Sequence, residues 1–524
     1  MQANSVGDTP SGSMFDELFD NFRIDMGTSS LDASIAPDNF NRRADLITTA
    51  RQRQGTETIP MDPFAAYQVL FPPSILHSPQ SSTEDNFTSG PLTSLTDPAW
   101  DFVVWSQYMN RVPEWLSTKS SIWSCYHYLI NLAQAIPNSP LFHGILSWTY
   151  AYLFRLGLYS ESSRVTHYTT ASQFVQLLSD ELSDRSSTTS PASFPIDSSE
   201  KLSQYISTTF FLCHHDLIVG DFSSFIARIN ETKVTFRRHW KNNTMPGIIE
   251  SRIVIWLAFM ELRFLFLGGS VDPADHEQQD LMGLLVELNA LPTLRGPRKQ
   301  QSYLRECFGN GLPKEENDQE LGKERCREKF DVIFSYLSKL RSFEVWESEK
   351  QPSSSNAEPL LKELREAKID ALRANLARIH AECELVFPSH MLGSNWAQNV
   401  DTSTFHIMTV RALCLSSTIM LNRVTNPTVR TDPDAQSAAR EIVRLCRVFR
   451  KSKSLESPRS VIWPLPLFVA GIEIDDEVYQ DWILDYMKDL NQWGLHVVKS
   501  RELLEQIIQW QDSNGSRASM KDLF

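Results

Sequence analysis

The sequence predicts an all-α protein, in which a large multi-helix body follows a disordered, acidic N-terminal region. Two observations favour this fold class. From residue 97 onward, apolar residues recur at intervals of three and four, the spacing of one helix face. No segment sustains the alternation of apolar and polar residues that a half-buried strand needs. With 41% hydrophobic residues among 524, the chain can bury a large core.

Residues 1–96 are expected to be mostly disordered, because they offer little that a core could bury. All 13 Trp residues lie at or after Trp100. Residues 1–98 carry 13 acidic but only 5 basic side chains. Such a composition cannot offset the entropy cost of ordering the chain. Two apolar islands interrupt it, at Phe15–Met26 and at Phe64–Ile75.

Residues 13–26 form the more informative island. Four large apolar residues stand at i, i+3, i+4 and i+7, which is one face of a short helix: Phe15, Leu18, Phe19 and Phe22. Acidic residues surround this apolar face. Acidic residues keep such a face solvated until a groove on a partner accepts it. The pattern is typical of a transcriptional activation segment that contacts a coactivator. The alternative is a helix that docks on the protein's own body.

Four helices are predicted before a Ser/Thr/Pro-rich loop at 183–199. The third begins at Pro140, because proline suits the first helical position and Asn138–Ser139 gives a capping signal before it. The fourth follows Ser160, and its inward residues are predicted to be Phe174, Leu177 and Leu178.

Helices resume at Glu200 and continue to the C-terminal region. Gly220 is expected to end one of them. The next feature, Ile248–Leu267, is apolar nearly all round and is expected to be the central buried helix. Two long charged helices follow, at about 321–349 and 357–386. Two further helices are predicted at Phe405–Leu421 and Ala435–Phe449.

Charge and cysteine usage exclude several classes of protein. A net charge of −14 argues against nonspecific coating of nucleic acid. The 7 cysteines are scattered without a C-x-x-C pair, which excludes zinc fingers and indicates reduced thiols of an intracellular protein. The chain does not start with a secretory signal. The most apolar stretch, Ile253–Leu267, is broken by Glu261 and Arg263, so no membrane association is expected.

No residue set indicates an enzyme. The motifs G-x-x-x-x-G-K-[ST], G-x-G-x-x-G and G-x-S-x-G are absent. His214–His215–Asp216 looks like a metal cluster, but adjacent helical side chains point about 100° apart. His380 and Cys383 have workable spacing but no second pair. Asp475–Asp476–Glu477 looks like a magnesium motif but also suits the acidic start of a helix. We predict no catalytic, metal-ligating or cofactor-binding residues and no cofactor.

Several segments resemble the fungal-specific transcription factor domain, the all-α regulatory region of fungal binuclear zinc-cluster transcription factors. Ser139–Leu146 and Gly220–Asp221 are similar to its first half. The resemblance is sharpest at the C-terminal end, in Trp463–Glu473 (WPLPLFVAGIE), Asp481–Leu484 and Arg501–Trp510.

The resemblance implies a regulatory body at 97–512, between the N-terminal region 1–96 and a flexible tail at 513–524. It also implies a nuclear transcriptional regulator whose partners are coactivators or other regulators. The family normally carries a cluster of six cysteines that binds two zinc ions, but the first cysteine here is Cys125. We therefore expect no DNA binding through that module. The alternative is a helical scaffold or adaptor without a transcriptional role; a homodimer and a small-molecule effector stay open.

Overall fold

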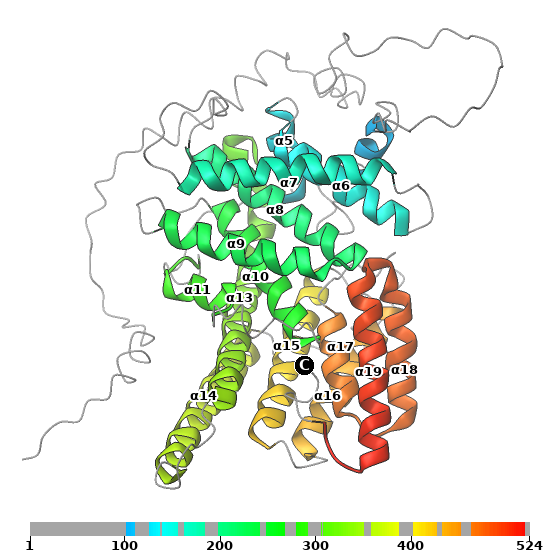
Figure 1. The fold of residues 1–524 in the computed structure, drawn as a ribbon. Coiled ribbons are helices and arrows are strands. Elements are labelled where there is room, and N and C mark those ends of the chain that lie inside the picture. Colours follow the sequence, from blue (N-terminus) through cyan, green and yellow to red (C-terminus); the bar gives the residue numbers. More distant parts are fainter. Residues whose placement is uncertain are drawn as a thin grey trace, which may run out of the picture. The chain divides into compact units, whose positions relative to one another are not determined.

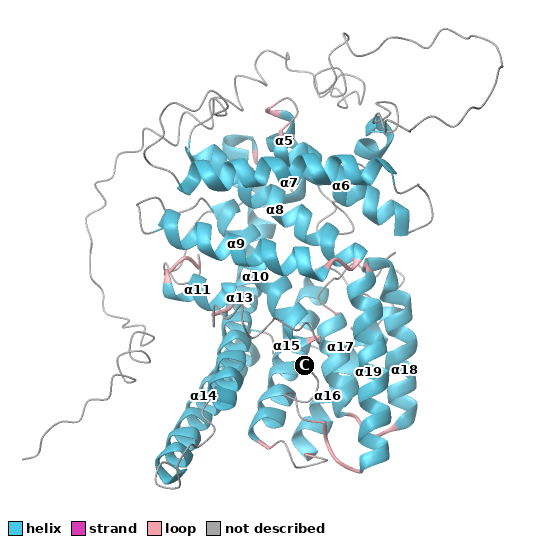
Figure 2. Ribbon diagram, viewed as in Figure 1, coloured by secondary structure: helices cyan, strands magenta, loops and turns pink. Residues whose placement is uncertain are grey.

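Every described element of the protein is a helix in the computed structural model shown in Figures 1 and 2. No strand occurs among the described residues, which confirms the predicted all-α class. The chain divides into residues 1–58 and 59–524, and all described residues belong to the second unit. The described ranges are 101–109, 125–136, 139–155, 162–183, 198–240, 248–267, 279–291, 305, 308–349, 358–386, 402–426, 432–451 and 463–518.

The first group of helices packs in sequence order. After a helical segment at 101–109 come α5 (Cys125–Gln134), α6 (Pro140–Arg155), α7 (Ser162–Ser183), α8 (Ser198–Val219), α9 (Phe222–Trp240), α10 (Ile248–Phe266) and α11 (Leu281–Glu287). Helix α6 packs on α7 and α8, and α8 packs in turn on α9 and α10. As predicted, α6 begins at Pro140, and Gly220 follows the end of α8 with a left-handed φ of 78°.

One inward residue of α7 was predicted wrongly. Leu177 is 44% exposed, whereas Val175 and Leu178 are buried in the core. Successive helical residues point about 100° apart, so Leu177 and Leu178 cannot both face the same neighbour. Phe174 is half-buried and stacks on His143.

Helix α10 is the buried central helix that its composition predicts. Nearly all of its described side chains are buried, the half-buried Trp256 excepted. The charge of Glu261 is compensated there, because Lys233 Nζ of α9 lies 2.6 Å from its carboxylate. The backbone N–H of Leu281 donates a second hydrogen bond to the same carboxylate at 2.6 Å. A buried charge that has both partners can be tolerated in a core.

The second group of helices holds the longest elements. It comprises the short η4 (Gly309–Gly311), α13 (Lys314–Glu349), α14 (Glu358–Val386), α15 (Thr402–Thr425), α16 (Pro433–Lys451), α17 (Pro464–Glu473), α18 (Glu477–Asp489), η7 (Leu490–Trp493) and α19 (Leu495–Asn514). Helix α13 begins at Lys314 and not near 321 as predicted. Glu315 and Glu316 in its first turn favour that earlier start, because acidic residues complement the positive end of the helix dipole.

Helix α15 is the centre of this second group. It packs against α13, α14, α16 and α17. Within the described part of the chain, Thr404–Thr425 is the one segment long and apolar enough to cross a membrane. Most of that segment is buried inside the helical body, as expected for a core helix.

The C-terminal helix closes on α17. Gly471 permits this contact, because a Cβ atom there would lie 2.8 Å from the Cδ2 of Leu504. Helix α19 runs to Asn514, and Arg517 beyond it is buried against Glu473. The packed body therefore continues past residue 512, where the sequence placed the start of a flexible tail.

Candidate functional site

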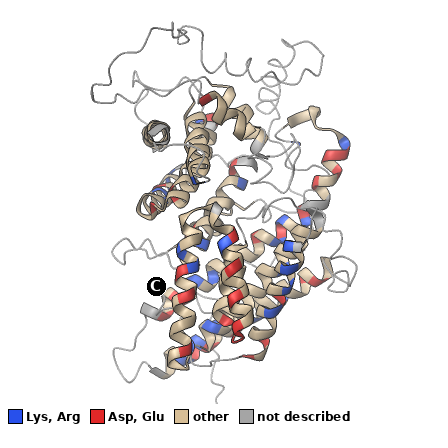
Figure 3. Ribbon diagram, turned by 90° about the vertical axis from the view of Figure 1, so that its right-hand side faces the viewer, with Lys and Arg blue, Asp and Glu red and all other residues tan. Residues whose placement is uncertain are grey.

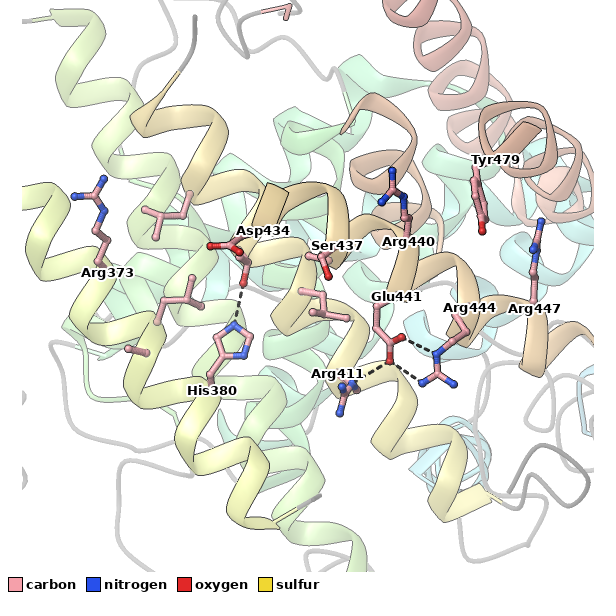
Figure 4. Close-up of a pocket in the computed structure, with 16 residues that line it drawn as sticks. Arg373, His380, Arg411, Asp434, Ser437, Arg440, Glu441, Arg444, Arg447 and Tyr479 are labelled. Carbon is pink, nitrogen blue, oxygen red and sulfur yellow. Dashed lines mark hydrogen bonds and ion pairs between the residues drawn. The ribbon is translucent and has the colours of Figure 1, made fainter. Parts of the chain in front are cut away.

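A groove of about 1020 Å³ lies between α14, α15 and α16 (Figure 4). Helices α14 and α16 each pack on α15, so α15 forms the floor and the other two form the walls. Tyr479 of α18 stands at one end of the groove, beside Arg447, and Arg373 of α14 stands at the other.

Helical periodicity explains why each helix turns one face to the groove. The residues that α14 and α15 contribute recur at intervals of three or four: Arg373, Leu376, Ala377 and His380 on α14, and Arg411, Leu415, Thr418 and Leu421 on α15. On α16 the groove residues Arg440, Arg444 and Arg447 share one face. The opposite face of α16 is buried in the core and includes Ile442 and Cys446.

The groove is rich in arginine although the chain as a whole is acidic. Five of the lining residues are arginines, and only Asp434 and Glu441 are acidic. The whole chain carries a net charge of −14. Figure 3 shows acidic and basic positions intermixed over the helices in the lower part of the view. An excess of guanidinium groups in a concave site of such a chain favours an anionic ligand.

Glu441 is shared between arginines of two helices. Arg444 forms a two-point contact with it, with Nε at 2.6 Å and Nη2 at 2.7 Å from the two carboxylate oxygens. Arg411 of α15 approaches the same carboxylate with its Nε at 3.5 Å (Figure 4). A single carboxylate thus holds two guanidinium groups at the groove wall.

The remaining arginines of α16 have different surroundings. Arg447 lies over the rings of Tyr479 and Trp482, at 4.9 and 5.2 Å from their centroids. Arg440 is exposed, and no carboxylate of the described residues pairs with it. Stacking holds the Arg447 guanidinium in place without cancelling its charge, so both arginines can receive an anion.

His380 supplies a neutral hydrogen-bonding group to the α14 wall. Its Nε2 lies 2.9 Å from the hydroxyl oxygen of Thr418 on α15. Burial, and secondarily the positive charge of Arg411, lower the pKa of His380. Near neutral pH the positive charge of the groove therefore comes from its arginines.

This arrangement suits a small ligand with an anionic group and an apolar body. Guanidinium groups bind carboxylate, phosphate or sulfonate oxygens through paired N–H donors. Leu376, Leu415 and Leu421 provide apolar surface in the same groove. Sites for small molecules combine such apolar lining with a few well-placed polar groups.

The predicted coactivator contact lies outside the described residues. This holds for the whole segment 13–26, with Phe15, Leu18, Phe19 and Phe22, and also for the island Phe64–Ile75.

The two histidines that resembled part of a metal cluster pack against different aromatic rings, although His215 Nδ1 stays 3.3 Å from the carboxylate of Asp216. His214 packs on Phe210 at 4.6 Å between ring centroids, and His215 stacks on Tyr168 at 4.4 Å. Burial and the charge of Arg263 lower the pKa of His214 to about 3. In the described ranges, no three or more His, Cys, Asp or Glu side chains are placed to hold a metal ion.

Two other sequence candidates have local partners. The carboxylate of Asp476 accepts hydrogen bonds from the backbone N–H groups of Val478 and Tyr479, so it caps the start of α18. Cys383 lies with its sulfur 3.5 Å from the sulfur of Cys414 on α15. The first arrangement is structural, and the second joins α14 to the floor of the groove.

The groove arginines were not among the residues predicted from the sequence, although the sequence carries a local signal for them. Arg440, Arg444 and Arg447 stand at i, i+4 and i+7, the spacing of one helix face. That spacing indicates a basic face on a helix whose other face is apolar. It does not reveal that Arg411 and His380, from two other helices, stand beside it.

Comparison with known proteins supports the resemblance found in the sequence. The family described as fungal specific transcription factor domain matches residues 104–266 and 320–517, together more than half of the chain. No curated protein and no solved structure matches the chain. All helices of the groove lie within the second matched segment. The chain therefore belongs to the family of the fungal specific transcription factor domain.

Proposed function

We propose that this protein is a nuclear regulator of transcription whose helical body binds a small anionic effector. We also propose that the N-terminal segment 13–26 contacts a coactivator. The family match supports a role in transcription regulation, because the family is a regulatory domain of transcription factors and not a class of enzymes. Nuclear localisation follows from that role.

The observation that carries the effector role is the arginine excess of the groove. A ligand seated there would contact Arg373 or His380 of α14 together with Arg440 or Arg444 of α16. Such a ligand stabilises the distance between α14 and α16 at which both helices contact it, relative to other distances. This gives the helical body a physical means to respond to a small molecule.

A reporter assay on the full chain tests the effector role. The chain is fused to a heterologous DNA-binding domain, and Arg440→Gln/Arg447→Gln is compared with Arg378→Gln. Arg378 is an exposed arginine of α14 that does not line the groove. We expect the double variant to change reporter output at equal protein level and the Arg378 variant to leave it unchanged. Equal output from all three proteins would contradict the effector role.

The same fusion tests the coactivator contact. Replacing Phe15, Phe19 and Phe22 by Ala removes most of the apolar area that a partner groove could bury, so reporter output should collapse. The matched change, Asp16→Asn/Asp20→Asn, keeps that area and should reduce output only partly. A reporter that stays silent with the intact chain would instead favour a scaffold without a transcriptional role.

A further inference from the structure

Two cysteine thiols meet at the contact between the α14 wall and the α15 floor of the groove. The sulfur of Cys383 lies 3.5 Å from the sulfur of Cys414, although 31 residues separate them in the chain. A disulfide bond requires about 2.05 Å between the sulfurs. The two sulfurs therefore need to approach each other by only about 1.4 Å.

The contact is built into the way the two helices pack. Cys383 and Cys414 are one helical turn from His380 and Thr418, which form the neighbouring contact at 2.9 Å. Two successive side-chain contacts thus join α14 to α15. The first of them lines the groove, and the thiol pair, which does not line it, lies one helical turn further along the same helix contact.

The two thiols differ in exposure and in protonation. Cys383 is half-buried, whereas Cys414 is only 2% exposed. The hydrogen bond between the two thiols lowers the pKa of Cys383, and the charge of Lys329 on α13 acts in the same direction. The same hydrogen bond raises the pKa of Cys414. Cys383 is therefore placed to react with the oxidant first, with Cys414 as the resolving thiol.

We propose that Cys383 and Cys414 form a reversible disulfide when the protein meets a peroxide, and that this bond weakens anion binding in the adjacent groove. The second half rests on the effector role proposed above. Drawing the two sulfurs together moves the α14 wall toward the α15 floor, which narrows the groove beside His380. Intracellular disulfides of this kind are transient and act as sensors.

The reaction balances with hydrogen peroxide as the oxidant. The Cys383 thiolate attacks one peroxide oxygen, so an S–O bond forms, the O–O bond breaks and hydroxide leaves as water after taking up the Cys383 proton. The Cys414 sulfur then attacks Cys383, so the S–S bond forms and the S–O bond breaks. The departing hydroxyl takes the Cys414 proton and leaves as a second water. The two sulfurs give up two electrons, which the peroxide gains.

Peptide mapping of the full chain after peroxide treatment tests the bond. Trypsin separates the two cysteines, because Cys383 lies in the peptide 379–411 and Cys414 in the peptide 412–423. We expect these peptides to appear linked, with a loss of two hydrogen atoms, and to separate on treatment with dithiothreitol. Cys213, which is fully buried on α8, should stay reduced over the same period.

Three single variants test whether the linkage requires these two cysteines. Cys383→Ala and Cys414→Ala should each abolish the linked peptides, and in Cys414→Ala the oxidation of Cys383 should stop at the sulfenic acid. Cys213→Ala removes a buried thiol from another helix and should leave the rate of linkage unchanged. The proposal is overturned if both thiols remain alkylatable after Cys213 is oxidised, or if the three thiols oxidise at one common rate.

Binding of anilinonaphthalene sulfonate, a fluorescent sulfonate with an apolar body, tests the effect on the groove. We expect the linked protein to bind this probe about fivefold more weakly than the reduced protein, the lower end of ordinary coupling between sites. Linked protein with unchanged affinity would overturn the second half of the proposal. Reduced protein that fails to bind the probe would instead count against the effector role, while the peptide map still decides whether the disulfide forms.

Discussion

Two clusters in the second group of helices have the same composition, one glutamate between two arginines, but opposite surroundings. In the buried triad (Arg423, Glu473 and Arg517), the two arginine side chains are 1% exposed and the glutamate is 0% exposed. In the groove triad, Arg411, Glu441 and Arg444, the corresponding fractions are 27%, 21% and 49%.

Most of the polar atoms of the buried triad are hydrogen-bonded within the protein. The guanidinium of Arg423 lies 3.0 Å from the Glu473 carboxylate and also donates to the backbone carbonyls of Ile472 at 2.9 Å and Ala518 at 2.7 Å. Arg517 pairs with the same glutamate. These bonds tie α15, α17 and the end of the chain together, so the triad holds the fold.

The groove triad differs because solvent reaches it and further arginines surround it. Arg440 and Arg447 stand on the same face of α16 as Arg444. Residue type alone therefore does not distinguish the two clusters. Burial, and the presence of further arginines beside the triad, decide whether such a cluster stabilises the fold or is available to a ligand.

The largest expected effect comes from making the same substitution in both triads. Glu473→Gln removes the carboxylate that two buried guanidinium groups share, so the free energy of unfolding should fall by about 3–5 kcal/mol. Glu441→Gln removes a half-exposed partner and should cost less than about 1 kcal/mol. Urea unfolding followed by circular dichroism measures both. Similar losses from the two variants would remove the distinction drawn between the triads.

Salt should weaken the electrostatic interactions of the groove triad more than those of the buried triad. Raising sodium chloride from about 0.1 M to about 1 M shortens the screening length from about 10 Å to about 3 Å, and should weaken binding of anilinonaphthalene sulfonate by roughly fivefold. The stability difference between the wild-type protein and Glu473→Gln should stay nearly constant, because buried charges are screened far less. Fluorescence titration and urea unfolding at the two salt concentrations check this pair of expectations.

Glu441→Gln should change the affinity of the groove for its ligand, although it should change the stability of the protein little. Glu441→Gln removes one of the two acidic residues of the groove and frees the paired donors of Arg444. We therefore expect anilinonaphthalene sulfonate to bind about threefold more tightly to this variant, a change of about 0.6 kcal/mol. Weaker binding would mean that Glu441 is needed to orient the arginines for the ligand.

The smallest expected effect is that of pH. Because the pKa of His380 is lowered, the folded protein takes up this proton only below the ordinary value of about 6.5. Affinity for the sulfonate probe should therefore be level between about pH 8 and about pH 6.5, and rise at lower pH as His380 gains a positive charge. His380→Gln should abolish that rise. A step in affinity centred above pH 7 would point to a different titrating group.

Local signals made much of the fold predictable from the sequence. Pro140 marks the start of α6, and Gly220 marks the end of α8 through its left-handed backbone. The all-round apolar composition of α10 predicts its burial. The prediction that Leu177 faces inward was wrong. A rotation of the helix by one residue, about 100°, moves a side chain from the core to solvent, and the sequence alone does not fix that rotation.

The groove was not predictable in the same way. Its arginines come from three helices, and the pairing of Arg411 with Glu441 depends on how α15 packs on α16. The contact of Cys383 with Cys414 depends likewise on the packing of α14 on α15. Spacing along the chain records which residues share a helix face, but not which faces meet.

Titration with anilinonaphthalene sulfonate tests most directly whether the arginine-lined groove is an anion site. The double variant Arg440→Gln/Arg447→Gln should bind the probe at least about tenfold more weakly than the wild-type protein, a loss of about 1.4 kcal/mol. Arg378→Gln should bind as the wild-type protein does, and the double variant, which loses the stacking of Arg447 on Tyr479 and Trp482, should lose no more than about 1 kcal/mol of stability in urea unfolding. Equal affinity of the double variant and the wild-type protein would contradict the claim.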